Sequence, residues 1–176
     1  LAMVPENVLS NRQLMLKACQ KDRSALRRVG PTLSHDKDFL EEVIDVDIEA
    51  LGFLPHHSQR RFPELLMDNM KQFFDCSQTD TLEFLDTVAE DVRTMPRFVE
   101  AYFKSGGVFR NNYFPGEMSD DEQIFLWVAE YCRKWHWSTA FEHISDRLRS
   151  NSDFILKAIE LNPFVYWCAS KEIKND

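Results

Sequence analysis

The residue types that bind transition metals gather in one stretch of the carboxyl-terminal third of the sequence. Cys132 and His136 are four residues apart, which places them on one face of a helix, and His143 follows. Thiolate and imidazole groups at this spacing bind zinc, but a structural zinc site has four ligands. No paired cysteines and no His-Glu-x-x-His motif accompany these three residues. The sequence therefore predicts no metal site here.

A second candidate for metal chemistry is the acidic motif Asp45-x-Asp47-x-Glu49. It is similar to the start of a calcium-binding EF-hand loop, which requires glycine at position six and glutamate at position twelve. Ala50 and His56 stand at those two places. We interpret the surrounding acidic residues as the solvent-facing side of a helix.

Nucleophilic and phosphate-binding motifs are also missing from the sequence. There is no Gly-x-Ser-x-Gly motif, and the four cysteines do not occur in a recognised catalytic context. The stretch Ser105-Gly106-Gly107 lacks the lysine of a phosphate-binding loop. The sequence predicts a non-catalytic protein without a cofactor, and an enzyme of an unannounced class stays open as the third alternative.

The composition restricts the kind of partner and the compartment. A formal net charge of −8 argues against nucleic acid and against anionic membrane surfaces. No apolar run approaches the roughly 18 residues of a membrane span, so no membrane insertion is expected. The widely spaced cysteines and the absence of an Asn-x-Ser/Thr sequon indicate an intracellular protein. Its compartment is unknown, with the cytoplasm as the default.

The elements that would position any site come from an internal repeat. Residues 11–36 align with residues 151–176, a separation of 140, with identical residues at five positions. A smaller step of 25 places Phe39 at the position of Leu14 and Val43 at that of Ala18. Such periods are typical of stacked helical repeats, in which each two-helix unit is covered by its neighbours. Ala18 and Ala158 are expected to be buried.

Capping residues mark where the expected helices begin and end. We expect helices over residues 11–21, 23–29, 62–75 and 120–135. Ser10 with Gln13, and Ser119 with Glu122, form the pattern of a capping box. Gly30 is expected to cap the carboxyl end of the 23–29 helix. In the last unit, Asn162 is expected to cap a helix that has Pro163 at its first position.

These features predict an all-α fold, a solenoid-like stack of short antiparallel helical hairpins with a period of about 25 residues. Residues 1–176 are expected to form a single helical repeat domain. The expected parts are clear repeats at 11–35, 36–61, 119–150 and 151–176, a degenerate middle at 62–104, and an insertion loop at 105–118.

The repeat motifs also resemble a known family. An Asp-x-Asp-Phe sequence opens the helix at Asp36, an Ala-Leu pair follows at Ala50, and residues 154–162 read Phe-Ile-Leu-Lys-Ala-Ile-Glu-Leu-Asn. This pattern resembles domain of unknown function 4116 over residues 11–54 and 141–176. The resemblance implies a helical stack and no assigned chemistry.

The insertion loop and a tryptophan cluster are the candidate functional surface, because loops on rigid repeat scaffolds often carry function. Two interpretations of the loop are open: it folds back onto the stack, or it presents its side chains to a protein partner of unknown identity. The candidate partner-binding residues are Phe109, Arg110, Tyr113, Phe114, Trp135 and Trp137. We predict a protein-interaction or scaffold module whose acidic face selects basic partners. The alternative is a small-molecule or cofactor binder with a pocket under the loop, lined by Trp127, Trp135, Tyr113 and Phe114.

Overall fold

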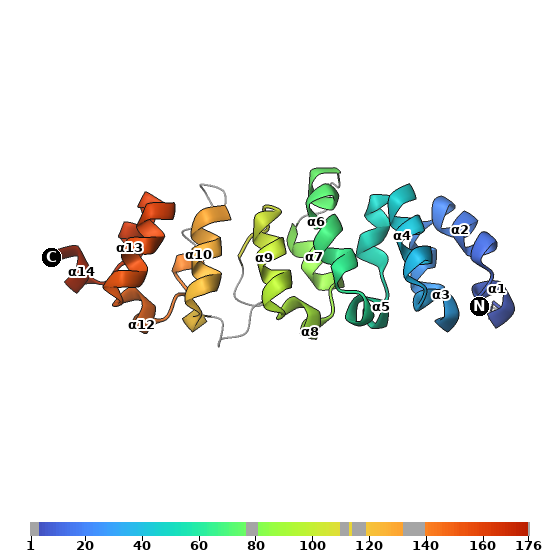
Figure 1. Cartoon of the computed structure of the whole chain (residues 1–176), viewed down its shortest axis with the longest axis horizontal. Coiled ribbons are helices and arrows are strands. Elements are labelled where there is room, and N and C mark those ends of the chain that lie inside the picture. The colour runs from blue at the N-terminus through green and yellow to red at the C-terminus, as the bar shows by residue number, and fades with distance from the viewer. Residues whose placement is uncertain (1–3, 77–80, 110–112, 114–118, 132–139, 176) are drawn as a thin grey trace. The chain divides into compact units, whose positions relative to one another are not determined.

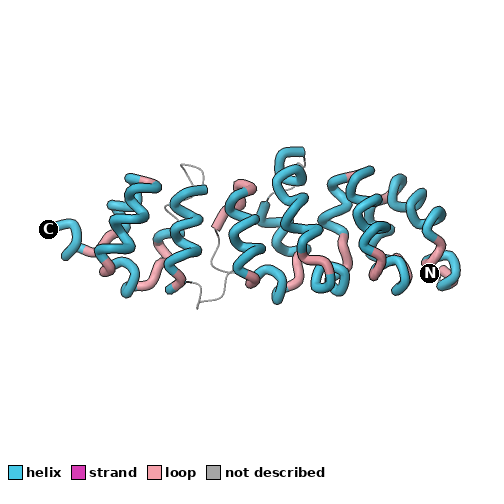
Figure 2. Tube along the Cα trace, in the orientation of Figure 1, coloured by secondary structure: helices cyan, strands magenta, loops and turns pink. Residues whose placement is uncertain are grey.

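The computed structural model describes residues 4–76, 81–109, 113, 119–131 and 140–175. These residues form helices joined by turns, and no strand occurs among them (Figures 1 and 2), which confirms the all-α prediction. No helix in this part of the chain has both the length and the apolar character needed to cross a membrane. The chain divides into two compact units, unit 1 (Leu1–Val92) and unit 2 (Arg93–Asp176).

Both units consist of short α-helices and 3₁₀-helices, the latter labelled η. Unit 1 contains α1 (Glu6–Leu9), α2 (Arg12–Lys21), η1 (Arg23–Arg28), α3 (Pro31–Ser34), α4 (Lys37–Val46), η2 (Ile48–Phe53), α5 (His56–Arg61), α6 (Glu64–Cys76), α7 (Thr81–Thr87) and α8 (Glu90–Arg93). Unit 2 contains α9 (Pro96–Lys104), α10 (Glu122–Tyr131), α12 (Asp146–Arg149), α13 (Ser152–Leu161), η4 (Pro163–Cys168) and α14 (Lys171–Asn175). Each predicted helix therefore has a counterpart with ends that differ by a few residues, except that the predicted end of the 120–135 helix lies outside the described residues.

Three pairs of elements share one local plan: the first hairpin (α2 and η1), the second hairpin (α4 and η2) and the C-terminal hairpin (α13 and η4). Each begins with an Asx side chain that accepts a hydrogen bond from the backbone N–H of the third helical residue, which satisfies one of the unpaired donors there. A second Asx residue ends the α-helix and caps the 3₁₀-helix by accepting from the backbone N–H of its second residue. The first caps are Asn11, Asp36 and Asn151, and the second caps are Asp22, Asp47 and Asn162.

The predicted caps at Ser10 and Ser119 are wrong by one and two residues. Ser10 has helical backbone angles because it closes α1 by donating its N–H to the Glu6 carbonyl. The extended backbone that a cap requires is found at Asn11 instead. At α10, the Asp121 carboxylate accepts from the N–H groups of the second and third helical residues.

The prediction that Gly30 caps the carboxyl end of the 23–29 helix is wrong, because Gly30 does not have the left-handed conformation of such a cap. Its φ of −64° makes it the N-cap of α3, and its N–H donates to the Leu9 carbonyl at 2.9 Å. A Cβ here would lie 2.6 Å from the Ser10 hydroxyl and 3.2 Å from the Leu9 backbone, so a larger residue would force Ser10 to move.

After the second hairpin, a side-chain hydrogen bond takes the place of the backbone bond that Gly30 donates after the first hairpin. Ser170 repeats the Gly30 bond in unit 2, where its N–H donates to the Arg149 carbonyl at 3.0 Å. Pro55 stands at the same place after η2 and has no N–H to donate. The Ser58 hydroxyl donates to the Ser34 carbonyl at 2.7 Å instead, so this carbonyl keeps a partner inside the protein.

The core of unit 1 is formed between successive hairpins. Phe39 and Val43 of α4 are almost completely buried. Leu14 occupies the same helical position as Phe39 but is 49% exposed, and Ala18 is only half-buried. The expectation that Leu14 and Ala18 face the core is therefore wrong for Leu14 and holds only in part for Ala18. The buried Gln59 amide joins α5 to the turn after α7 through bonds to backbone groups.

The core of unit 2 is dominated by phenylalanine. Its fully buried rings include Phe98, Phe103, Phe125, Phe141 and Phe154. α10 packs against both α9 and α13, so this aromatic core runs through the unit. Ala158, expected in the core, is fully buried.

Candidate functional site: an exposed aromatic face on the C-terminal hairpin

The structure places the first residue of the predicted site in the core. Phe109 is 2% exposed, with its ring centroid 6.4 Å from that of Phe103 and 5.7 Å from that of Phe125. A side chain buried in this way offers no surface to a partner. Phe109 is therefore not an exposed partner-binding residue in this structure, and the described start of the loop, residues 105–109, folds back onto the helices.

Two hydrogen bonds between Tyr102 and the backbone of Val108 hold the start of the loop against the helices. The Tyr102 hydroxyl donates to the Val108 carbonyl and accepts from the Val108 N–H, both at 3.0 Å. Gly107 is buried against the Tyr102 ring, where an added Cβ would collide with ring atoms. Gly106 has a φ of +91°, which L-residues rarely adopt. The two glycines thus turn the chain so that Phe109 enters the core.

The other predicted residues are only partly within the described chain. Tyr113 is half-buried, and the guanidinium of Arg93 lies 5.5 Å from the centre of its ring. Trp127, from the alternative pocket, is also half-buried. The remaining members of the two candidate sets, Arg110, Phe114, Trp135 and Trp137, lie outside the described residues, as do Cys132 and His136. Their roles stay predictions.

The largest exposed aromatic side chains of the described chain lie on the C-terminal hairpin. Trp167 is 68% exposed and Tyr166 is 40% exposed, with their rings edge to face at 5.7 Å. On α13, Leu156 is 60% exposed, Ile159 is half-buried and Glu160 is exposed. These five residues are called the C-terminal face below.

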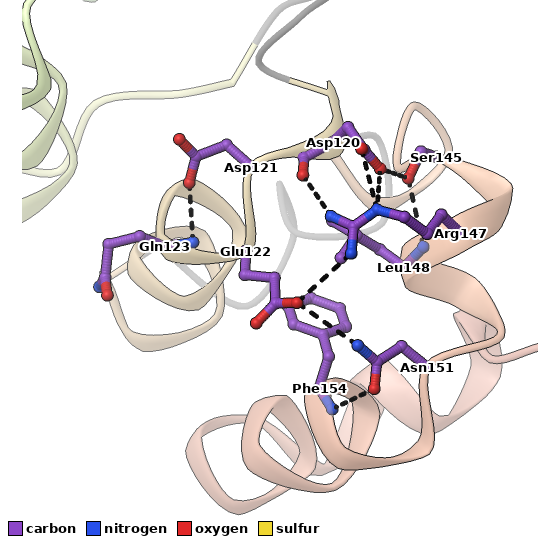
Figure 3. Close-up of polar contacts among 9 residues, drawn as sticks. All are labelled: Asp120, Asp121, Glu122, Gln123, Ser145, Arg147, Leu148, Asn151 and Phe154. Carbon is purple, nitrogen blue, oxygen red and sulfur yellow. Dashed lines mark hydrogen bonds and ion pairs between the residues drawn. The ribbon is translucent and has the colours of Figure 1, made fainter.

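A polar cluster fixes the C-terminal hairpin against α10 (Figure 3). The Asp120 carboxylate accepts from the Ser145 hydroxyl and from Arg147 Nε at 2.9 Å, and the Arg147 guanidinium also donates to the Asp120 carbonyl. Asn151, the cap of α13, extends its amide towards Glu122 at 3.4 Å. The beginning of α13, the helix that carries Leu156, Ile159 and Glu160, is therefore anchored through α12.

The first hairpin shows what the same positions do when a neighbour covers them. Tyr166 stands where Leu26 stands in the first hairpin, and Leu26 is 0% exposed. Ile159 corresponds to Cys19, which is 3% exposed. Sequence analysis missed the C-terminal face because its residues occupy repeat positions that are normally core positions. The available signal was the Tyr-Trp pair at a place where the other hairpins have Leu-Arg and Leu-Gly.

A single protein-family model matches the two segments of the sequence that contain these hairpins. The family described as domain of unknown function (DUF4116) has a model that matches residues 11–58 and 120–174, more than half of the chain. The chain belongs to the DUF4116 family. The first DUF4116 segment contains the first two hairpins, and the second contains the C-terminal hairpin with all five residues of the C-terminal face. Comparisons with curated proteins and with solved structures give no significant match.

A concave surface, the second candidate site, begins in the first DUF4116 segment and continues beyond it to α7. Two adjoining hollows of about 260 and 530 Å³ share Arg27, Gly52 and Thr87. Two cations of this surface already have partners within the protein: the Arg27 guanidinium lies 4.8 Å from the Phe53 ring centre, and Arg23 is paired with Glu49. This DUF4116 surface is therefore a weaker candidate than the C-terminal face.

Proposed function

We propose that the chain is a non-catalytic protein-interaction or scaffold module, built as a solenoid-like stack of helical hairpins with a period of about 25 residues. The shared cap geometry of the three hairpins supports this architecture. The single observation that carries the interaction role is the C-terminal face. It exposes a tryptophan, a tyrosine and a leucine on one hairpin.

Energetics favour a binding role for these side chains. Trp and Tyr are enriched among residues whose truncation costs a protein interface about 2 kcal/mol or more. Their rings carry large contact areas at a low cost in conformational entropy. Leaving such area in water is unfavourable by about 25 cal/mol per Å² of apolar surface. A partner that covers Trp167 and Tyr166 would recover this free energy.

The proposal includes an intracellular location. Cys19, Cys76 and Cys168 are free thiols among the described residues. Free thiols at a buried and an exposed position are typical of a reducing compartment.

The proposal is tested by capture from a cell extract with the immobilised chain, followed by mass spectrometry. The variant carries Tyr166→Ala and Trp167→Ala, and the control carries Leu14→Ala, an exposed apolar residue of unit 1. We expect a protein that binds the parent and the control but loses at least tenfold with the double variant. Circular dichroism should show the same helix content in all three. Equal capture by the parent and the double variant would refute the role of this face.

A further inference from the structure

We infer that the concave surface of unit 1 binds an extended peptide segment of a partner protein, with an acidic side chain of the segment at Arg27 and a basic side chain at α7. The surface consists of the two adjoining hollows described above, which share one residue from each of η1, η2 and α7. All of their lining residues belong to unit 1. The inference therefore adds a binding site, separate from the C-terminal face, to the proposed interaction function.

Three successive elements form this surface in the order of the chain. η2 contacts both η1 and α7. η1 contributes Arg23 and Arg27, η2 contributes Gly52 to both hollows, and α7 contributes the two carboxylates Glu83 and Asp86. The surface thus has arginines from one element, a glycine in the middle and acidic residues from the third. Proteins built from helical repeats use surfaces of this kind for binding.

The structure gives no reason why the middle position has to be glycine. Gly52 does not have a positive φ, and an added Cβ would meet only the Phe73 ring, at ordinary contact distances of 3.8 Å or more. The other two hairpins have Arg27 and Trp167 at this repeat position. Glycine lowers helix stability, and a residue that breaks a local rule without a structural reason indicates a functional position. We interpret Gly52 as the residue that keeps the shared part of the two hollows open.

The cationic end of the surface is prepared for a carboxylate. Arg27 is exposed and forms no ion pair with the residues that the structure describes, whereas Arg23 is paired with Asp47 and Glu49. The contact with the Phe53 ring uses the face of the Arg27 guanidinium. Its N–H groups lie in the plane of the group, so they stay available to the two oxygens of a carboxylate. An arginine held in this way loses less conformational entropy when it binds.

The opposite end of the surface favours a cation. Glu83 and Asp86 are both exposed on α7, with Glu83 in the smaller hollow and Asp86 in the larger one. The Thr87 hydroxyl beside them already donates to the Phe84 carbonyl at 2.7 Å. A peptide with charges of one sign would be repelled by one end of the surface, whereas a peptide with both signs is attracted at both ends. The segment that fits has an acidic residue, small or neutral residues over Gly52, and a basic residue.

The test starts from a phage-displayed library of linear random peptides, selected on the immobilised full chain. Peptides that also bind the Gly52→Leu chain are removed first, because leucine at this position would occupy the shared part of the hollows. We expect enriched peptides that have an acidic and a basic residue separated by a short neutral stretch. No enrichment, or enriched peptides that lack one of the two charges, would overturn the inference.

The affinity of one enriched peptide, labelled for fluorescence anisotropy, then locates the two ends. We expect Arg27→Ala to weaken binding at least tenfold and Glu83→Gln at least threefold. The matched controls are Arg28→Ala and Glu90→Gln, two exposed charged residues that line neither hollow. Both should bind like the parent chain. Parent-like binding by the Arg27→Ala chain would overturn the inference, and this result does not depend on how the Gly52→Leu chain folds.

Stability separates a binding role of the glycine from a structural one. Gly52→Ala should unfold at the same or a higher urea concentration than the parent, since no contact or backbone angle requires glycine. A clearly lower midpoint would show that the fold needs the glycine, and the inference would fail.

The outcome is distinguishable from that of the proposed function. The chain with Tyr166→Ala and Trp167→Ala should bind the selected peptide like the parent, because neither residue lines the hollows. If the peptide selection fails while capture from an extract still depends on these two aromatic residues, this inference falls and the interaction role of the C-terminal face stands. If the selected peptide needs Trp167 instead of Arg27, it occupies the C-terminal face, and the inference is overturned.

Discussion

Truncation of Phe109 to alanine tests whether the glycine-rich loop is part of the core of unit 2. The ring is 2% exposed and lies within aromatic contact distance of Phe103, Phe125 and His143. Removing a buried phenylalanine side chain costs about 3–5 kcal/mol, from lost apolar burial and from the cavity left behind. A loss of this size is a large fraction of the roughly 5–15 kcal/mol that stabilises a domain.

The measurement is urea-induced unfolding followed by circular dichroism. We expect the transition midpoint of Phe109→Ala to fall well below that of the parent. The control Leu14→Ala removes an apolar side chain that is 49% exposed, and surface changes of this kind alter stability by about 0.5 kcal/mol or less. If Phe109→Ala unfolded like the control, Phe109 would not be a core residue, and the interpretation of the loop as a binding surface would be restored.

Three further predictions concern other positions. Ala158→Asp should cost several kcal/mol in thermal or urea unfolding because it buries an unpaired charge, whereas Ala18→Asp, at a half-buried position, should cost much less. Equal losses would contradict the different burial of these two alanines. Partial burial, and then the His35 ring stacked at 5.4 Å, lower the pKa of His57, so the folded state disfavours its protonation. Stability should therefore fall as the pH drops below about 6.5, the ordinary histidine pKa, and His57→Gln should reduce this dependence in pH-resolved melting curves. Burial, and then the nearby Asp22 carboxylate, raise the pKa of Cys19 to about 11, so this thiol should react with iodoacetamide at pH 8 only after unfolding, as peptide mass spectrometry can show.

The repeat pattern of the sequence carries much of the local structure. Phe39 and Phe154 were matched by sequence alone, and both lie at the third position of a helix that follows an Asx cap. The pattern works because capping and apolar spacing act over a few residues, which is the range that a repeat preserves. Leu14 shows the limit: its residue type is that of a core position, but it is 49% exposed, because burial depends on tertiary contacts that a local pattern does not encode.

The candidate site was harder to predict, for the same physical reason. Phe109 follows two glycines, and a polar or glycine-rich stretch indicates a surface loop without showing where its aromatic side chains point. The inward turn depends on hydrogen bonds from Tyr102, several residues earlier. Tyr166 differs from its expectation in the opposite direction from Phe109. Its repeat position indicates a core residue, but it is 40% exposed.

Some of the acidic residues of the chain have a structural role as helix caps. Asp22, Asp36 and Asp47 each hold the first turn of a helix, and Asp121 does so for α10. Four of the 29 acidic residues thus also serve to start helices. Substituting any one of them would change the stability of a helix as well as the net charge of the protein.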